Sequence, residues 1–472
     1  MYEVALMNNV NKLDTYNPAA PDELVASYVV TEESELDVII QSAQSAQSEW
    51  SEIPQPRRGA IIGEFLDALE GAKDQIASVM TMETGKVLAE SHGEVAKALG
   101  EGRAMIARAS SPSGEVLPSQ VPGTLTYTIR RPRGVVVGIN PWNFPFSTPM
   151  RKAIPALLYG NAIILKPASL APGALVKFQE IADAFFPKGL VRTVVGNGAL
   201  ASTLVGHDGV AAVSFTGSTS VGKKVAQMAV SHLAEVSLEL GGKNPVIVHD
   251  SHDLALVAEQ VATAAFAVSG QRCTAISRVL VHESLVESMV ELLASQAVQK
   301  RPEPDNKDGG GIGPLISKAQ LDSVATFVER AQGEGAKVVA GGEHVASKGG
   351  GFYYAPTVLG GVTREMEVAR EEVFGPVIAV ISYSNIEEGL EVANDVAYGL
   401  SACLYSENCA AVDEFLSRCD AGMLHVNCGS FPENHLPFVG VKDSALGVGG
   451  SNGQSVIHFY TTEHSIYQRA KV

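Results

Sequence analysis

Cysteine is scarce in this sequence: there are five among 472 residues, and no two of them form a C-x-x-C pair. Their number is odd and their positions are scattered, which argues against a disulfide framework and against a zinc site. The eleven histidines form no H-E-x-x-H motif, so we expect no bound metal. This cysteine usage favours a reducing compartment, and we expect a cytoplasmic protein.

Long apolar runs and an excess of basic residues are missing as well. No stretch approaches the roughly 18 uninterrupted apolar residues of a membrane span. The first residues lack the basic start and apolar core of a secretory signal. Acidic residues outnumber basic ones by 52 to 35, which gives a net charge of −17. We therefore expect neither nucleic acid nor a membrane as a partner.

Short β-branched runs alternate with helical patterns over most of the chain. Runs that end in turn residues predict buried strands at 134–141, 161–168, 211–218, 244–250, 277–284 and 375–383. Helical patterns lie at 254–268 and 284–299, and the second opens with Ser284 and Glu287 at capping-box spacing. This alternation predicts an α/β fold with parallel, doubly wound sheets. Ligands of such sheets bind beyond the carboxyl ends of the strands.

The stretch "FTGSTSVGKKV" (215–225) reads as a strand, a glycine-rich turn and a helix. Gly217 and Gly222 permit close approach of a ligand, and the first amides of the helix attract phosphate. The pattern nearly matches G-x-x-x-x-G-K-[ST], but Lys224 stands where a magnesium-binding hydroxyl is needed, which excludes a nucleoside triphosphatase. A plain strand–helix connection is the alternative for this turn.

Cys273, in "SGQRCTA" (269–275), lies on a predicted loop beside Arg272, which could lower its pKa. A lone cysteine is more often packing material than a nucleophile. Two other residues change that balance. Glu239, among apolar neighbours at a strand end, is either a structural ion-pair partner or a tuned base, and Asn143 offers an amide donor. A nucleophile, a base and an oxyanion donor together predict covalent catalysis.

Five motifs occur in the order "PWNFP" (141–145), "FTGST" (215–219), "LELGGKNP" (238–245), "GQRCTA" (270–275) and "EEVFGPV" (371–377). In these motifs the chain resembles the NAD(P)-dependent aldehyde dehydrogenases, over nearly its whole length. The resemblance implies that Cys273 attacks the aldehyde and that Asn143 and the Cys273 backbone N–H hold the oxyanion. It also implies that Glu239 activates the water that hydrolyses the thioester, and its presence speaks against acylating relatives, which use coenzyme A.

The resemblance implies a dinucleotide site as well. Its residues would be Trp142, Lys166, Ser169, Gly217, Ser218, Glu372 and Phe374. Many NAD-preferring members carry a glutamate three residues after the lysine, whereas this chain has Ser169 there. A carboxylate would repel a 2′-phosphate, and a hydroxyl near Lys166 can accept one. We therefore expect both NADP and NAD to be used, with NADP preferred.

The substrate is expected to carry an acid group. Arg151, eight residues after Asn143, stands where succinate-semialdehyde dehydrogenases bind the substrate carboxylate, although a structural arginine is the alternative. Arg272 or Arg278 could supply a second charge, and Phe431 is expected to face the pocket. The C-terminal part also resembles α-ketoglutarate-semialdehyde dehydrogenases. An apolar or aromatic aldehyde as substrate, and a catalytically silent scaffold of the same fold, are the alternatives.

The fold implied by the resemblance has three parts. These are a Rossmann-like cofactor domain (1–112 and 133–241), an α/β catalytic domain (242–442), and a small β oligomerisation arm with a C-terminal segment (113–132 and 443–472). "TLTYTIRRP" (124–132) alternates like an exposed strand, and an unpaired edge of that kind needs a partner. We therefore expect a homodimer or a homotetramer acting on a small-molecule aldehyde.

Overall fold

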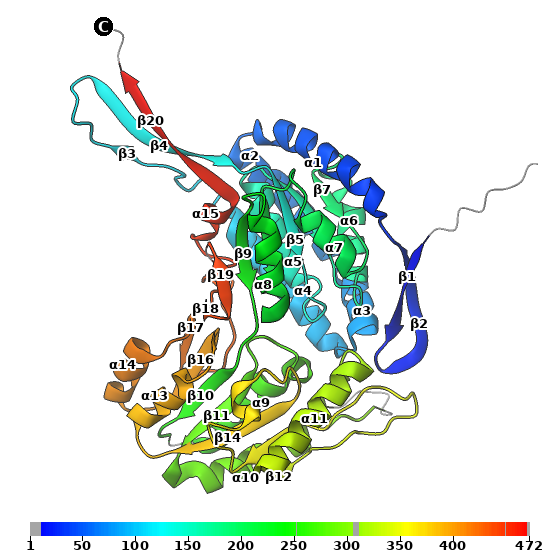
Figure 1. The fold of residues 1–472 in the computed structure, drawn as a ribbon, viewed down its shortest axis with the longest axis vertical. Coiled ribbons are helices and arrows are strands. Elements are labelled where there is room, and N and C mark those ends of the chain that lie inside the picture. The colour runs from blue at the N-terminus through cyan, green and yellow to red at the C-terminus, as the bar shows by residue number, and fades with distance from the viewer. Residues whose placement is uncertain (1–10, 252, 305–310, 449, 470–472) are drawn as a thin grey trace, which may run out of the picture.

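Two α/β bodies and a projecting arm make up the molecule, as the computed structural model in Figure 1 shows. The structure describes residues 11–251, 253–304, 311–448 and 450–469. The glycine-rich stretch at 301–314 therefore lies partly outside the described residues. The predicted α/β class, with mainly parallel sheets, is confirmed.

A six-stranded sheet forms the centre of the first body, in the order β19-β9-β8-β5-β6-β7. Its strands are β5 (Val135–Ile139), β6 (Ala162–Lys166), β7 (Val191–Thr193), β8 (Ala212–Thr216), β9 (Glu235–Glu239) and β19 (Ala445–Gly447). Neighbours are parallel except β19, which is antiparallel to β9. The strands β5 and β6 are buried throughout, as the continuous apolar runs of a covered parallel sheet require.

Helices pack around this first sheet (Figure 1). They are α1 (Leu36–Ser51), α2 (Gln55–Gly71), α3 (Lys73–Thr84), α4 (Leu88–Ile106), α5 (Ser147–Leu158), α6 (Gly173–Ala182), α7 (Gly198–Val205), α8 (Thr219–Val230) and α15 (Val456–Tyr460). The indole of Trp50 on α1 is buried and donates to the carbonyl of Leu157 on α5 at 2.8 Å. The 19-residue helix α4 packs along α5, and this pairing becomes important at the site.

The second body has a seven-stranded sheet in the order β12-β13-β14-β11-β10-β16-β17. Its strands are β10 (Asn244–Val248), β11 (Ile276–His282), β12 (Lys337–Ala340), β13 (Thr357–Gly360), β14 (Val377–Tyr383), β16 (Ser401–Tyr405) and β17 (Met423–Val426). All neighbours are parallel except β12 and β13. The six strands predicted from the sequence are all present in the two sheets.

Helices of the second body include the two that the sequence predicts. They are α9 (Leu254–Phe266), α10 (Val286–Gln299), α11 (Lys318–Glu334), α12 (Glu367–Arg370), α13 (Ile386–Asn394) and α14 (Cys409–Arg418). The capping box predicted at Ser284 is wrong, because a 3₁₀ turn, η3 (Glu283–Leu285), precedes α10. The ring of His282 accepts the N–H of Ser284 instead.

Three small sheets or hairpins lie outside the two bodies. The arm consists of β3 (Val116–Leu117), β4 (Thr124–Pro132) and β20 (Thr461–Arg469), which form an antiparallel sheet that projects from the first body (Figure 1). A hairpin of β1 (Lys12–Asn17) and β2 (Ala20–Val29) and a short pair of β15 (Tyr398–Gly399) and β18 (Val441–Lys442) complete the strands.

The chain passes from the first body to the second between β9 and β10. The domain boundary expected near 242 falls in this connection. The segment 443–472 does more than complete the arm, because β19 extends the first sheet and Phe459 and Tyr460 of α15 belong to the first apolar core. The division into domains stays a prediction.

Candidate active site

One cavity of about 600 Å³ lies where the strand ends of the first body meet the second body. Its walls come from the segments after β5, β8 and β9, from α4 and α5, and from the turn before β11. All but three of the predicted site residues line it: Trp142, Asn143, Arg151, Gly217, Ser218, Glu239, Arg272, Cys273, Glu372, Phe374 and Phe431. Lys166 ends β6 and Ser169 follows three residues later, and neither lines the cavity. Arg278, the alternative to Arg272 for a second charge, is also outside it, because its buried guanidinium donates to the backbone carbonyls of Lys243, Val392 and Ala393.

A strained turn leads to Cys273. Ser269 has a φ of 56°, in the left-handed region that residues with a Cβ rarely adopt. Gly270 follows with a φ of 70°, and a Cβ there would lie 2.1 Å from the carbonyl oxygen of Gly375. The hydroxyl of Ser269 donates to the carbonyl of Gly313 at 2.6 Å. These contacts hold a costly backbone conformation and thereby fix where Cys273 enters the cavity.

Ionisation of the Cys273 thiol to a thiolate is strongly disfavoured. Burial raises its pKa to about 12, and the carboxylates of Glu372 and Glu239 act in the same direction. The charges of Arg151 and Arg272 lower the pKa, as the position of Arg272 predicts, but burial outweighs them. Arg272 thus lowers the pKa of Cys273 as expected, but the larger effect of burial keeps Cys273 a neutral thiol near pH 7.

Glu239 ends β9 with its carboxyl group in the cavity wall. One carboxyl oxygen accepts the backbone N–H of Ser451 at 3.3 Å, and the other has no hydrogen-bond partner among the described residues. Burial raises the pKa of Glu239 to about 8, although the charge of Lys152 opposes this rise. A buried carboxyl group with one open oxygen and a pKa near neutrality is suited to take up and release a proton.

The amide of Asn143 connects the two bodies. Its Nδ2 donates to the backbone carbonyl of Gln271 at 2.8 Å, two residues before Cys273. This bond uses one of the two amide hydrogens, so the other is available to an oxygen in the cavity. The side chain is buried just before the start of α5, which makes it a preorganised donor close to Cys273.

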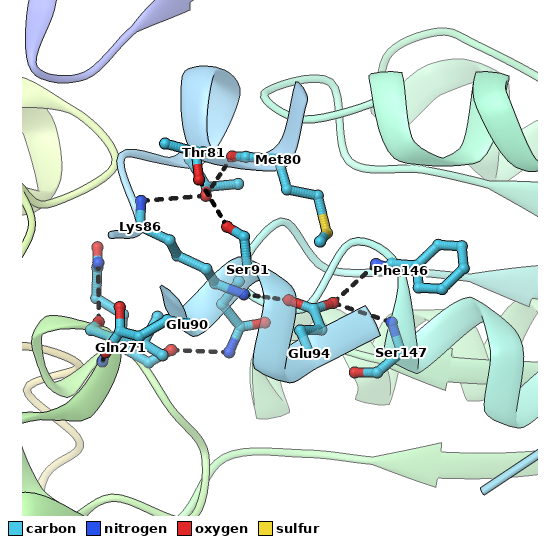
Figure 2. Close-up of polar contacts among 12 residues, drawn as sticks. Met80, Thr81, Lys86, Glu90, Ser91, Glu94, Phe146, Ser147 and Gln271 are labelled. Atoms are coloured by element: carbon cyan, nitrogen blue, oxygen red, sulfur yellow. Dashed lines mark hydrogen bonds and ion pairs between the residues drawn. The ribbon is translucent and has the colours of Figure 1, made fainter. Parts of the chain in front are cut away.

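Two glutamates of α4 hold the loops of the site, and Figure 2 shows both. Glu94 accepts the backbone N–H groups of Phe146 and Ser147 at the start of α5, each at 2.9 Å, and forms a buried ion pair with Lys86. Glu90 accepts the N–H of Val268, in the strained turn before Cys273, at 2.7 Å. Sequence reasoning missed both, although their four-residue spacing places them on one face of the helix.

The turn between β8 and α8 is shaped for a phosphate group. Ser218 is the N-cap residue of α8, but its side chain makes no capping bond, so the first amides of the helix stay open. A Cβ on Gly217 would lie 2.6 Å from the ring of Phe215, and one on Gly222 would lie 2.4 Å from Leu240. A side chain does not fit at either position, so glycine is needed there and the backbone of this turn stays accessible to a ligand.

Glu372 and Phe374 reach the same cavity from the second body. Glu372 accepts the N–H of Gly242 at 3.1 Å, and burial raises its pKa to about 7. Phe374 has a φ of 53° and meets Trp142 edge to face, with ring centres 5.6 Å apart. A carboxyl group and two aromatic rings thus line the same cavity as the turn between β8 and α8, where a ribose and a planar ring could be held.

Lys166 and Ser169 form a separate polar corner. Lys166 is buried, burial lowers its pKa to about 8, and it forms no ion pair within the described ranges. The hydroxyl of Ser169 donates to the carbonyl of Gly196 at 2.9 Å. A buried lysine without a carboxylate partner suits an anionic or polyhydroxyl group, so the residues here and at α8 fit a phosphorylated dinucleotide.

Basic residues gather at another part of the cavity. Arg151 donates from Nε and Nη2 to the two carboxylate oxygens of Glu101, at 2.8 and 2.7 Å, and stacks on Phe438. Arg272 stacks on Phe431, which is half exposed. The sequence predicts Arg151 as a cation for the substrate, and the structure shows that Glu101 already occupies one edge of its guanidinium.

Within the described parts of the chain, no group of three or more histidine, cysteine, aspartate or glutamate side chains could hold a metal ion. No helix in those parts is both long and apolar enough to cross a membrane.

Comparison with known proteins places this geometry among relatives. The model of the "Aldehyde dehydrogenase family" matches residues 6–466. The chain is 38% identical over 461 residues to the alpha-ketoglutarate semialdehyde dehydrogenase of Haloferax volcanii, covering 96% of this chain and 94% of that protein. It is 37% identical over 456 residues to the alpha-ketoglutaric semialdehyde dehydrogenase of Bacillus subtilis, covering 96% and 93%. The lactaldehyde dehydrogenase of Escherichia coli superposes with a TM-score of 0.93 at 32% identity, covering 98% of this chain and 96% of that one.

Proposed function

This chain belongs to the aldehyde dehydrogenase family, whose members are NAD(P)-dependent oxidoreductases, and we propose that it oxidises a short acid-semialdehyde to the corresponding diacid. The observation that carries the proposal is the single cavity shared by Cys273, Glu239, Asn143 and the basic residues around Arg151. Succinate semialdehyde and α-ketoglutarate semialdehyde are the substrates that we favour, and the two semialdehyde dehydrogenases above support the second.

In the mechanism we propose, Glu239 in its ionised form takes the proton of the Cys273 thiol. The sulfur then bonds to the aldehyde carbon, and the carbonyl electron pair moves to oxygen. The amide of Asn143 and the backbone N–H of Cys273 stabilise that oxyanion. When bound, the nicotinamide ring of NAD(P)⁺ supplies the acceptor for the hydrogen that leaves this carbon with its bonding electrons.

A thioester on Cys273 remains and must be hydrolysed. Glu239 first releases the thiol proton to solvent, which restores its carboxylate, and its open oxygen then takes a proton from water as the water oxygen bonds to the thioester carbon. The carbon–sulfur bond breaks, the acid leaves, and Cys273 regains a proton. A mobile Glu239 proton with a pKa near 8 fits both steps.

NADP is the cofactor that we expect to be preferred. The open amides of α8 would hold the pyrophosphate, with Glu372 and the ring pair of Phe374 and Trp142 nearer to the nicotinamide. Lys166 has no carboxylate partner in the described chain, and Ser169 brings no negative charge beside it. This corner would therefore accept a 2′-phosphate without like-charge repulsion.

The protein is proposed to act as a homodimer or homotetramer in the cytoplasm. The arm carries exposed apolar side chains, among them Val116, Leu125 and Tyr467, which a partner subunit would cover. All five cysteines are free, which supports a reducing compartment.

Nicotinamide reduction, followed as absorbance of the reduced cofactor, tests the proposal. The two acid-semialdehydes are compared with butanal and benzaldehyde, each with NADP and NAD. We expect turnover of an acid-semialdehyde, faster with NADP, and none after Cys273→Ala. Turnover restricted to butanal or benzaldehyde would contradict the acid-semialdehyde assignment. Absence of turnover with every aldehyde, together with a Cys273 no more reactive toward thiol reagents than Cys419, would indicate a silent scaffold.

A further inference from the structure

Helix α4 turns one long polar face toward the cavity. Glu90, Glu94, Lys97 and Glu101 follow one another at spacings of four, three and four residues, which places them along one stripe of the helix. The first two hold loops of the site through backbone amides. Lys97 is the member of this stripe that carries a positive charge, and it lines the cavity together with Arg151 and Arg272.

The ammonium group of Lys97 is anchored but not enclosed. It donates to the backbone carbonyl of Pro432 at 2.6 Å and lies 3.6 Å from a carboxylate oxygen of Glu101. Its side chain is 30% exposed, whereas that of Glu101 is 2% exposed. An ammonium group has three donors, so the carbonyl leaves hydrogens for a ligand in the cavity.

Charges around Lys97 do not balance. Glu101 is engaged by two hydrogen bonds from Arg151, so its negative charge is shared between two cations. Arg272 forms no ion pair in the described chain and has only Glu90 near it as a carboxylate in this group. Three cations therefore face Glu101 and Glu90 here, while Glu94 is matched by Lys86 and Glu239, which also acts on Arg151, is matched by Lys152. One positive charge is left over, and a partly buried cation of this kind favours a bound anion.

We propose that Lys97 is a specificity-determining residue that binds the carboxylate of the acid-semialdehyde together with Arg151. This inference rests on the proposed function and deepens it. Glu101 occupies Nε and Nη2 of Arg151, so that Nη1 remains for the substrate. A single substrate carboxylate would neutralise the one unpaired positive charge. Lys97 on α4 and Arg151 on α5 would both donate hydrogen bonds to this carboxylate.

Steady-state kinetics of Lys97→Met test this role, since methionine keeps the unbranched apolar part of the side chain and removes the ammonium group. We expect KM for succinate semialdehyde and α-ketoglutarate semialdehyde to rise at least about tenfold with little change in kcat. KM for butanal, which has the chain length of succinate semialdehyde but no charge, should stay the same or fall. Lys97→Arg should recover most of the affinity for the acids.

Lys177→Met is the matched control, because Lys177 is an exposed lysine of α6 paired with Glu180 and lies outside the cavity. It should leave every KM unchanged. Unchanged butanal turnover and Tm report whether Lys97→Met is folded. Inhibition by 4-oxopentanoate, an unreactive keto acid, gives a second measurement: its inhibition constant should also rise about tenfold in Lys97→Met.

Two results would overturn the inference. If KM for acids and for butanal rises equally, Lys97 has only a structural role. If neither KM nor the inhibition constant changes, Lys97 does not contact the carboxylate. A failure of the proposed function looks different, because it appears in the unmodified protein as no preference for acid-semialdehydes over butanal, and it overturns both proposals.

Discussion

At the scale of single residues, the two central groups of the site carry protons at neutral pH. Burial raises the pKa of Cys273 to about 12 and that of Glu239 to about 8. Only the second value lies in the range where a modest change of pH alters the charge. We therefore expect the ionisation of Glu239 to control the activity of the free enzyme, because Cys273 loses its proton only to the ionised form of Glu239.

The pH dependence of kcat/KM follows from this assignment. Because the pKa of Glu239 is raised to about 8, the carboxylate is the minor form of this group below that pH and the major form above it. We expect kcat/KM to rise about tenfold per pH unit below pH 8 and to level off above, since this parameter reports the free enzyme. A rate already at its plateau at pH 6 would contradict a raised pKa.

Two substitutions identify the titrating group. Glu239→Gln should remove the rise and leave one equivalent of reduced cofactor per active site, because the thioester forms slowly and is not hydrolysed. The charge of Lys152 lowers the pKa of Glu239, so Lys152→Met should move the midpoint to higher pH. A midpoint unmoved by Lys152→Met would assign the titration to another group.

At the scale of secondary-structure elements, α4 organises the site. It carries no catalytic residue of the predicted set, yet it holds the turn before Cys273 through Glu90 and the start of α5 through Glu94 (Figure 2). Parallel sheets place their loops at one edge, but loops are mobile unless something ties them down. A rigid helix whose glutamates accept hydrogen bonds from the backbone amides of these loops holds the loops in place.

The buried pair of Lys86 and Glu94 gives a stability prediction for α4. Glu94→Gln keeps an oxygen for the two amides but leaves Lys86 without a counter-charge, where both side chains are at most 2% exposed. We expect a loss of about 3 kcal/mol, measured by calorimetric unfolding. Glu180→Gln, in the exposed pair with Lys177, should cost less than about 1 kcal/mol. Equal effects of the two substitutions would contradict the importance of the buried pair.

At the scale of the whole molecule, the arm stands away from both bodies (Figure 1). Its sheet has two open edges, β20 and β3, and exposed apolar side chains on a thin antiparallel layer. Such a layer has little core of its own, so we expect it to pack against a second subunit.

The double variant Leu125→Asp/Tyr467→Asp tests this assembly by sedimentation. Placing two charges on the arm should dissociate the oligomer, because buried charges without partners oppose association. Val38→Asp changes an equally exposed residue on α1 and should leave the mass unchanged. A native protein that sediments as a monomer, or a double variant that keeps the native mass, would contradict assembly through the arm.

Much of this architecture follows from local pattern. The six predicted strands are present because continuous β-branched runs are stable only inside a covered parallel sheet. The predicted start of α10 is wrong, because the ring of His282 takes the N–H of Ser284 in place of the expected capping box. The turn at 215–225 has the glycine contacts and open amides that its composition predicts.

The sequence by itself determined the family, the α/β class and the residues that meet in one cavity, because motifs and periodicity are written in short stretches of chain. Only the tertiary structure decided how those residues are charged and held. Burial, which no local pattern reports, sets the pKa values of Cys273 and Glu239. The pairing of Arg151 with Glu101, fifty residues away in sequence, and the place of Lys97 beside them depend on the packing of α4 against α5.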